Sequence, residues 1–160
     1  METRFAVRRV RLRDLDRILE IEAACFGPDA YDRNLFAEYA HTCGGLFLVA
    51  HRGTKLCAYS IAAISPRNIA RNVARNMGER AELVSVAVDP AFFGKGAASA
   101  LMDSTLRRLR RRGATRLGLM VKVANHRARA FYAKYGFRML RRAAGYYEDG
   151  SDGLSLTKDL

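Results

Sequence analysis

A short glycine-containing turn stands between a strongly apolar run and a helical pattern. The run ends at Val86-Ala87-Val88, and Gly94-Lys95-Gly96 leads into Ala97-Ala98 at the start of the helix. Glycine lets the backbone approach a ligand, and the first N–H groups of a helix lack intrahelical acceptors and carry the positive end of its dipole. The pattern suits a pyrophosphate. It is neither a P-loop nor a dinucleotide fingerprint. Alone, it is also what an ordinary turn requires.

A second pattern lies nearer the C-terminus, where Asn125 precedes a helical segment that Gly136 closes. Ala128, Phe131, Tyr132 and Tyr135 form an apolar face on that segment. A tyrosine on such a face combines a core-packing ring with a hydroxyl that can do chemistry.

Both patterns resemble the GNAT superfamily of N-acetyltransferases. Residues 93–98 are similar to its cofactor motif Q/R-x-x-G-x-G/A, with Phe93 where Gln or Arg is usual. Residues 125–137 are similar to its N-x-x-A-x-x-x-Y-x-x-x-G-F signature. The tail from Tyr146 to Leu154 is similar to that of the ribosomal-protein-alanine acetyltransferase (RimI-like) group.

The resemblance implies an acetyl-CoA site and a role for each matched residue. Val86, Ala87 and Val88 would hold the pantetheine arm like an added strand, and Gly94, Lys95, Gly96, Ala97 and Ala98 would hold the pyrophosphate. Asn125 would face the cofactor arm. Tyr132 would lie near the thioester sulfur, where its phenol could protonate the leaving thiolate. The alternative for Tyr132 is a core tyrosine.

The resemblance leaves the identity of the catalytic base open. RimI-like enzymes carry a Glu where this chain has Met120, and methionine cannot accept a proton. Glu82 is the substitute, because it stands at the spacing of the catalytic Glu in the histone-acetyltransferase branch; a half-buried carboxylate there could take a proton. The alternative is a strand-edge Glu paired with Arg80. An α-amine, with a pKa near ~8, needs less help than a lysine near ~10.4.

Four aromatic residues are candidates for the wall of the acceptor site. They are Phe26, Tyr31, Tyr146 and Tyr147. Aromatic rings pack against a peptide backbone while tyrosine offers a hydroxyl. Ordinary surface and hairpin packing is the alternative.

The charge of the chain points to anionic partners. Twenty-eight basic residues against sixteen acidic ones give a net charge of +12, which attracts a polyphosphate cofactor, a nucleic acid or ribosome, or an acidic peptide. A period-four repeat places Arg67, Arg71 and Arg75 on one face if the segment is helical. That repeat predicts an RNA contact or, alternatively, a solvated connection.

Other site classes find little support in the sequence. Three cysteines and three histidines are scattered without a paired spacing, so neither a disulfide framework nor a metal site is expected. No apolar run is long enough to span a membrane, and the N-terminus lacks a secretory signal. We therefore expect a cytoplasmic protein that does not bind a membrane.

The surrounding sequence predicts the elements that position these groups. Apolar periodicity and the intervening turn residues predict strands at 5–10, 45–50, 57–64, 82–88, 117–123, 137–143 and 154–157, and helices at 14–26, 33–39, 98–112 and 126–135. Asp14 is expected to cap the first helix. This order predicts one α/β domain over residues 1–160, with a mixed central sheet of six to seven strands and helices on both faces. The resemblance implies that this domain has the GNAT fold.

Three functions follow from these observations. The first is acetyl transfer from acetyl-CoA to a primary amine, most simply a protein N-terminal α-amine, by direct attack in a ternary complex. The second is the same reaction on a small amine, which the basic surface would repel. The third is a non-catalytic GNAT module that binds CoA or nucleic acid, consistent with Phe93 and Met120.

Overall fold

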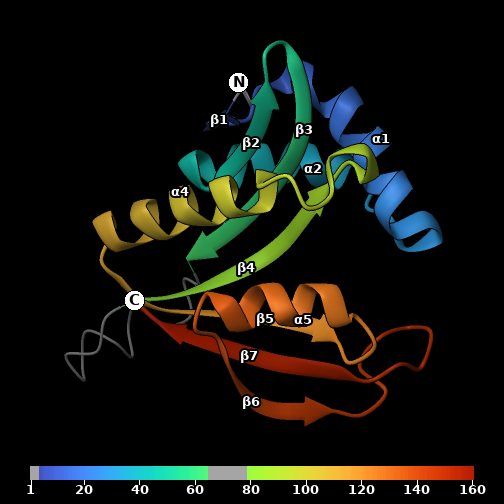
Figure 1. The fold of residues 1–160 in the computed structure, drawn as a ribbon, viewed down its shortest axis with the longest axis vertical. Helices are drawn as coiled ribbons and strands as arrows, with labels where there is room; N and C mark the ends of the chain where they lie inside the picture. Colours follow the sequence, from blue (N-terminus) through green and yellow to red (C-terminus); the bar gives the residue numbers. More distant parts are fainter. Residues whose placement is uncertain (1–3, 65–78) are drawn as a thin grey trace. The chain divides into compact units, whose positions relative to one another are not determined.

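The computed structural model describes residues 4–64 and 79–160. The Arg67, Arg71 and Arg75 repeat lies outside the described residues, and its predicted RNA contact stays a prediction. The helices and strands of the described part are β1 (Ala6–Arg9), α1 (Leu15–Phe26), α2 (Arg33–Thr42), β2 (Phe47–Arg52), β3 (Lys55–Ile64), β4 (Glu79–Val88), α4 (Ala97–Arg111), β5 (Ala114–Lys122), α5 (His126–Lys134), β6 (Arg138–Ala143) and β7 (Gly153–Asp159) (Figure 1).

The strands form one seven-stranded mixed sheet in the order β1-β2-β3-β4-β5-β7-β6. β1, β2 and β3 are joined antiparallel, β4 pairs with β5 in parallel, and β7 pairs antiparallel with both β5 and β6. The predicted fold class is therefore confirmed. Contacts divide the chain into two compact units, Met1–Ala63 with Leu83–Arg112 and Ile64–Glu82 with Gly113–Leu160.

In the first unit, helices cover both faces of the sheet because side chains alternate along β2. Phe47 and Val49 pack into the cluster that contains Ile18 of α1. Leu48, between them, packs into a separate cluster with Leu101 of α4. The alternation of buried residues along a strand thus places α1 and α2 on one face and α4 on the other.

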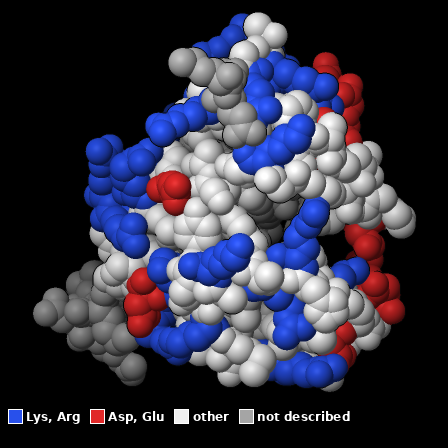
Figure 2. Space-filling view, in the orientation of Figure 1, with Lys and Arg blue, Asp and Glu red and all other residues white. Residues whose placement is uncertain are grey.

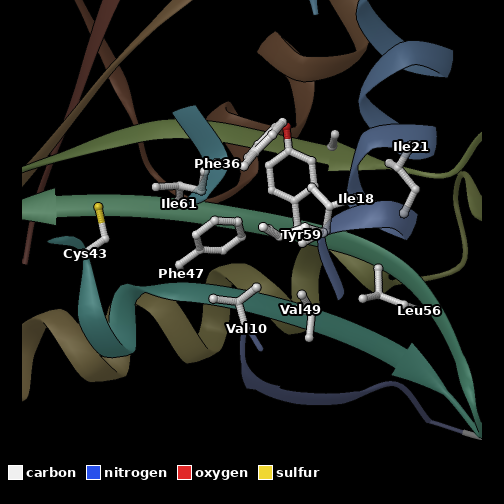
Figure 3. Packing of buried hydrophobic residues seen from close by; sticks show 12 residues of the cluster. Val10, Ile18, Ile21, Phe36, Cys43, Phe47, Val49, Leu56, Tyr59 and Ile61 are labelled. Carbon is white, nitrogen blue, oxygen red and sulfur yellow. The ribbon is translucent and has the colours of Figure 1, made fainter. Parts of the chain in front are cut away.

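Three aromatic rings fill the centre of the α1 and α2 side. Phe36, Phe47 and Tyr59 are fully buried, and their ring centroids lie 5.4–6.2 Å apart (Figure 3). Tilted and edge-on pairs of this kind add about 0.5–1.5 kcal/mol each beyond the area that they bury. The two helices are thereby fixed against β2 and β3.

Asp14 occupies the N-cap position of α1, as predicted, but its side chain makes no capping hydrogen bond to that helix. A 3-10 turn, Leu12–Asp14, precedes α1, and the Asp14 carboxylate accepts hydrogen bonds from the Arg11 N–H and from the Arg8 guanidinium at 2.7–2.9 Å. The part-buried ion pair with Arg8 of β1 thus takes the oxygens that a capping side chain would use. In α2, Asp32 does act as the cap, accepting from the Leu35 N–H at 2.9 Å, and the helix runs to Thr42 rather than ending at 39.

In the second unit, β5 lies between the first residues of β4 and β7. Glu82 of β4 pairs with Gly118 of β5, and Met120 of β5 pairs with Ser155 of β7. α5 carries the aromatic face predicted from the sequence, with Phe131 contacting Tyr132 and Tyr135 at ring distances of 5.5 and 5.1 Å. This unit therefore holds both candidate catalytic residues.

Candidate active site

The end of β4 is held in place by α1 and β3 within the first unit. Ala87 is buried in the core, while Val86 and Val88 are half-buried. The Val88 carbonyl accepts a hydrogen bond from the Cys25 thiol of α1 at 3.1 Å, and the Asp89 N–H donates to the Cys57 carbonyl at 2.8 Å. The strand predicted to hold the pantetheine arm is therefore fixed at its carboxyl end.

The glycine turn after β4 has the backbone that the pyrophosphate prediction requires. Gly94 and Gly96 adopt positive φ angles of 72° and 96°, which L side chains rarely adopt, and a Cβ at either position would meet no atom within 4 Å. Gly96 is the N-cap of α4 and brings no side chain to its first amides. Open space beside uncapped helix amides fits a phosphate group.

The side chains around this turn offer less to a phosphate ligand than the backbone of the turn does. Ala97 is buried against Leu48 and Leu101, so only its N–H is available to a ligand. Lys95 is exposed, with its Nζ 5.7 Å from the centre of the Phe92 ring. Phe93 is 42% exposed.

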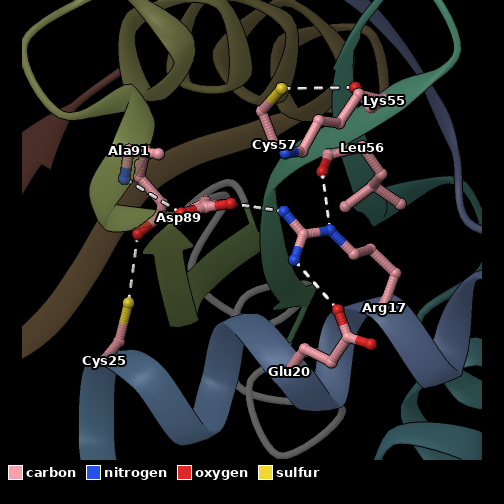
Figure 4. A network of polar contacts seen from close by, with 9 residues as sticks. Arg17, Glu20, Cys25, Lys55, Leu56, Cys57, Asp89 and Ala91 are labelled. Atoms are coloured by element: carbon pink, nitrogen blue, oxygen red, sulfur yellow. Dashed lines mark hydrogen bonds and ion pairs between the residues drawn. The ribbon is translucent and has the colours of Figure 1, made fainter.

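Asp89 and Arg17 connect this turn to α1 and β3, as Figure 4 shows. One Asp89 oxygen accepts the Ala91 N–H at 2.9 Å, and the other accepts a hydrogen bond from the Arg17 guanidinium. Arg17 also donates to the Leu56 carbonyl at 3.1 Å and to Glu20 at 3.0 Å. The backbone that leads to the glycines is thus tied to α1 by a partly buried ion pair.

Replacing Arg17 with methionine will lower the free energy of unfolding by about 1.5–3 kcal/mol, the usual contribution of hydrogen bonds to charged groups. The Ala91 N–H and then the Arg17 guanidinium lower the pKa of Asp89. The ion pair therefore adds its whole contribution to the free energy of unfolding above pH ~3.9, the pKa of an aspartate in the unfolded chain. That contribution is lost as the pH falls through the lower pKa of Asp89 in the folded protein. Urea unfolding at pH 7 and pH 3 measures both effects.

The matched control for this substitution is Arg13→Met, because Arg13 is exposed on the turn before α1. An Arg17 variant as stable as the Arg13 variant at pH 7 would contradict the account.

Tyr132 is the candidate acid in the second unit. The ring is half-buried and contacts Phe131 and Phe137 at centroid distances of 5.5 Å. Burial, and then the nearby Tyr147, raise the pKa of Tyr132 to about 12. The phenol therefore stays protonated at physiological pH and can donate a hydrogen bond.

The hairpin between β6 and β7 brings Tyr146 and Tyr147 together in the same unit. Their rings meet edge-on at 5.0 Å. The Lys122 ammonium lies 5.1 Å from the centre of the Tyr147 ring and 2.9 Å from an Asp149 oxygen. Tyr147 is thus half-buried, while Tyr146 remains exposed.

Met120 packs where the sequence analysis placed the missing base. A Cβ added at Gly153 would lie 2.9 Å from the Met120 Cε and 3.3 Å from atoms of Tyr146 and Tyr147. The thioether thus shares its surroundings with the two tyrosines.

The surroundings of Glu82 and Asn125 differ in part from those predicted. Glu82 is exposed, so the expected half-buried carboxylate is not observed, and no ion pair joins it to Arg80 in the described part of the chain. Asn125 caps α5 by accepting the Ala128 N–H at 3.2 Å. Their roles toward the cofactor and the acceptor stay predictions.

Phe26 and Tyr31 lie at the connection between α1 and α2 in the first unit, 39% and 37% exposed. The Tyr31 ring meets Phe36 edge-on at 6.0 Å, and the Tyr31 N–H donates to Glu22 at 3.0 Å. Glu22, Arg17 and Asp89 are not among the residues predicted from the sequence, although they contact the segments that carry those residues. A carboxylate on the apolar side of the α1 helical pattern was the available signal for Glu22.

Residues 15–137 match the family model described as the acetyltransferase (GNAT) family. The chain belongs to this family. It is an acetyl-CoA-dependent N-acetyltransferase, as the two sequence motifs predicted. The glycine turn, open beside uncapped helix amides, is the part of the structure that fits this cosubstrate.

Full-length relatives of this GNAT protein were also found. It is 30% identical to a candidate ribosomal protein bS18-alanine N-acetyltransferase of Bacillus subtilis, over 96% of this chain and 95% of that protein. It is 27% identical to an N-alpha-acetyltransferase of Saccharolobus solfataricus, over 98% and 93%. The predicted likeness to the RimI-like group is confirmed.

Solved structures show the same fold. Ard1 from Thermoplasma volcanium superposes with a TM-score of 0.86 at 22% identity, covering 98% of this chain and 97% of that one. The ribosomal-protein-S18-alanine N-acetyltransferase from Escherichia coli gives 0.78 at 22% identity, covering 98% and 94%.

The surface of this GNAT protein is strongly basic, with Lys and Arg side chains spread over the face shown in Figure 2. Five arginines lie at the end of α4. Arg108 is half-buried and donates to the Gly45 carbonyl at 3.0 Å, while Arg107, Arg110, Arg111 and Arg112 are exposed. Four of these five arginine side chains thus face the solvent.

Within residues 4–64 and 79–160, no group of three or more His, Cys, Asp and Glu side chains is arranged to hold a metal ion. The helices in this part of the chain are all too short or too polar to cross a membrane.

Proposed function

We propose that this protein transfers the acetyl group of acetyl-CoA to the N-terminal α-amine of a protein or peptide. The observation that carries the proposal is the glycine turn after β4, where Gly94 and Gly96 leave open space beside the first amides of α4 and where acetyl-CoA would bind. The relatives from Bacillus subtilis and Saccharolobus solfataricus, named for N-terminal acetylation and matched over nearly their full lengths, support this acceptor class.

In the proposed reaction, the amine attacks the thioester directly in a ternary complex. Val86–Val88 and the amides around Gly94–Ala98 hold acetyl-CoA, and Asn125 faces its arm. Tyr132 acts where the thiolate leaves. A thiol has a pKa near ~8.5, so full proton transfer from a phenol with a pKa of about 12 is uphill by roughly 5 kcal/mol. Tyr132 therefore acts mainly as a hydrogen-bond donor that stabilises the developing negative charge.

The acceptor class follows from the weakness of the available base. Met120 cannot take a proton, and the Glu82 carboxylate is exposed to solvent. A protein α-amine, with a pKa near ~8, is about one-tenth unprotonated at pH 7, whereas a lysine amine near ~10.4 is almost fully charged. Phe26, Tyr31, Tyr146 and Tyr147 supply exposed or half-buried aromatic surface for the peptide.

Replacing Glu82 with glutamine will lower the rate about tenfold at pH 7, because only the unprotonated tenth of the α-amine then reacts. The deficit will shrink as the pH rises toward 9. The measurement is kcat/KM for a peptide acceptor from pH 6.5 to 9.5, with Glu148→Gln, an exposed acid of the β6–β7 hairpin, as the control. An unchanged pH–rate profile would mean that solvent or another group takes the proton.

The acceptor class is tested by thiol release from acetyl-CoA with matched acceptors. Each peptide is supplied with a free α-amine, with that amine blocked, and with its lysine replaced; a polyamine completes the set. Free α-amine peptides should release thiol whether or not they contain lysine, and blocked peptides should not. Release only with the polyamine would favour the small-amine reaction and sink the proposal.

Association with RNA or the ribosome is a separate prediction. The exposed arginines at the end of α4 support it, since a basic cluster attracts phosphate backbones.

A further inference from the structure

A carboxylate lies in the core of the first unit. Glu22 of α1 is 2% exposed. One of its oxygens accepts the Tyr31 N–H at 3.0 Å, and the other accepts a hydrogen bond from the Tyr59 hydroxyl. Burial raises the pKa of Glu22, against the lowering effect of these two donors. Removing a carboxylate from water costs several kcal/mol, so its retention in an apolar cluster calls for a role.

The hydrogen-bonded chain continues to the central strand. Tyr59, fully buried on β3, places its hydroxyl 3.0 Å from the Ser85 Oγ of β4. Figure 3 shows the Tyr59 side chain among the core rings with its hydroxyl at their edge. Glu22 thus joins the backbone of the α1–α2 connection to the strand that leads into Val86–Val88.

The anchored segment is the one that carries Tyr31. Between α1 and α2, residues 27–32 contain a 3-10 turn, Gly27–Asp29, whose first residue has a φ of 53°. At Tyr31 the segment is held by the bond from its N–H to Glu22 and by the edge-on packing of its ring on Phe36. The Glu22 bond fixes the backbone, and the Phe36 contact orients the ring.

We propose that Glu22 is a positioning residue that fixes the 27–32 segment relative to β4 and thereby sets which acceptors the enzyme accepts. The inference rests on the proposed function, in which Tyr31 contacts the acceptor peptide. Misplacement by about 1 Å of a group that positions a substrate can cost ~10² in rate. The loss should appear mainly in the KM for the acceptor, because Glu22 bonds the Tyr31 backbone directly but reaches β4 only through Tyr59.

The test compares three variants. Glu22→Gln keeps an oxygen to accept the Tyr31 N–H and an amide to meet the Tyr59 hydroxyl, so it should behave like the parent. Glu22→Ala removes both contacts and should raise the acceptor KM about tenfold or more, as loss of a charge-assisted bond predicts. The KM for acetyl-CoA should not change. Tyr59→Phe breaks the link to β4 and leaves the Tyr31 bond, so its effect should be intermediate.

Amide hydrogen exchange at Tyr31, followed by NMR, gives a readout that does not depend on activity. The amide should be protected in the parent and in Glu22→Gln, and should exchange faster in Glu22→Ala. Where Glu22→Ala does not fold, Glu22→Asp replaces it, since the shorter side chain cannot reach both partners.

Two results would overturn the proposal. The first is equal protection of the Tyr31 amide in all variants. The second is an unchanged acceptor KM and an unchanged ranking of peptides in a variant whose Tyr31 amide has lost protection. If the parent acetylates no peptide at all, the proposed function fails, while the exchange experiment still decides whether Glu22 anchors the segment.

Discussion

Replacing Tyr132 with phenylalanine will lower kcat by about 10²–10³ while the affinity for acetyl-CoA stays nearly unchanged. The expected loss is that of a single hydrogen-bond donor to developing negative charge. Only the hydroxyl is removed, and the ring keeps its contacts with Phe131 and Phe137. Steady-state kinetics with a peptide acceptor measures kcat, and calorimetry measures acetyl-CoA binding.

Tyr135→Phe is the matched control for this substitution. It removes a hydroxyl at the C-cap of the same helix and leaves the Tyr135 ring on Phe131. Because the pKa of Tyr132 is about 12, the parent pH–rate profile should show no decline from its ionisation below about pH 11. Full activity of the Tyr132→Phe enzyme would show that Tyr132 is a packing residue.

Replacing Gly96 with valine will weaken acetyl-CoA binding about 100-fold. The β-branched side chain would fill the open side of the turn and would adopt a φ of 96°, a conformation that costs of order 1–3 kcal/mol for a residue other than glycine. Loss of charge-assisted hydrogen bonds from the displaced amides adds a similar amount. Calorimetric titration with acetyl-CoA measures the change.

The control variant Gly113→Val separates backbone strain from the loss of hydrogen bonds to acetyl-CoA. Gly113 follows α4 with a φ of 82° and also has open space at its Cβ, but it lies at the other end of the helix. The Gly113→Val variant should lose thermal stability without losing affinity for acetyl-CoA. Equal losses of affinity in both variants, or wild-type affinity in Gly96→Val, would remove the pyrophosphate role from this turn.

The fold could be predicted because local patterns determine most of its elements. The apolar run up to Val88, the glycines after it and the stripe on α4 each identified an element before any contact was known. The ends of elements depend on partners, and there prediction was weaker. Asp14 has the residue type of a helix cap, yet Arg8, which lies on β1, pairs with its carboxylate.

Among the site residues, too, those in local motifs could be predicted, and those that depend on distant partners could not. Gly94, Gly96 and Tyr132 belong to contiguous motifs, so their types and spacing were sufficient to identify them. Glu22 could be placed on the buried side of its helix, but its partners Tyr59 and Ser85 come from other strands and no local pattern indicates them. The environment of Glu82 was predicted incorrectly for a related reason, since exposure depends on packing rather than on spacing from Gly96.

The central claim is acetyl transfer to an α-amine, and tandem mass spectrometry of one product tests it most directly. A peptide with a free N-terminal alanine and one internal lysine is incubated with acetyl-CoA and the enzyme, and fragment ions locate the added acetyl group. The account predicts acetylation of the alanine α-amine and an unmodified lysine. Acetyl on the lysine alone, or an unmodified peptide under conditions in which a polyamine is acetylated, would contradict it.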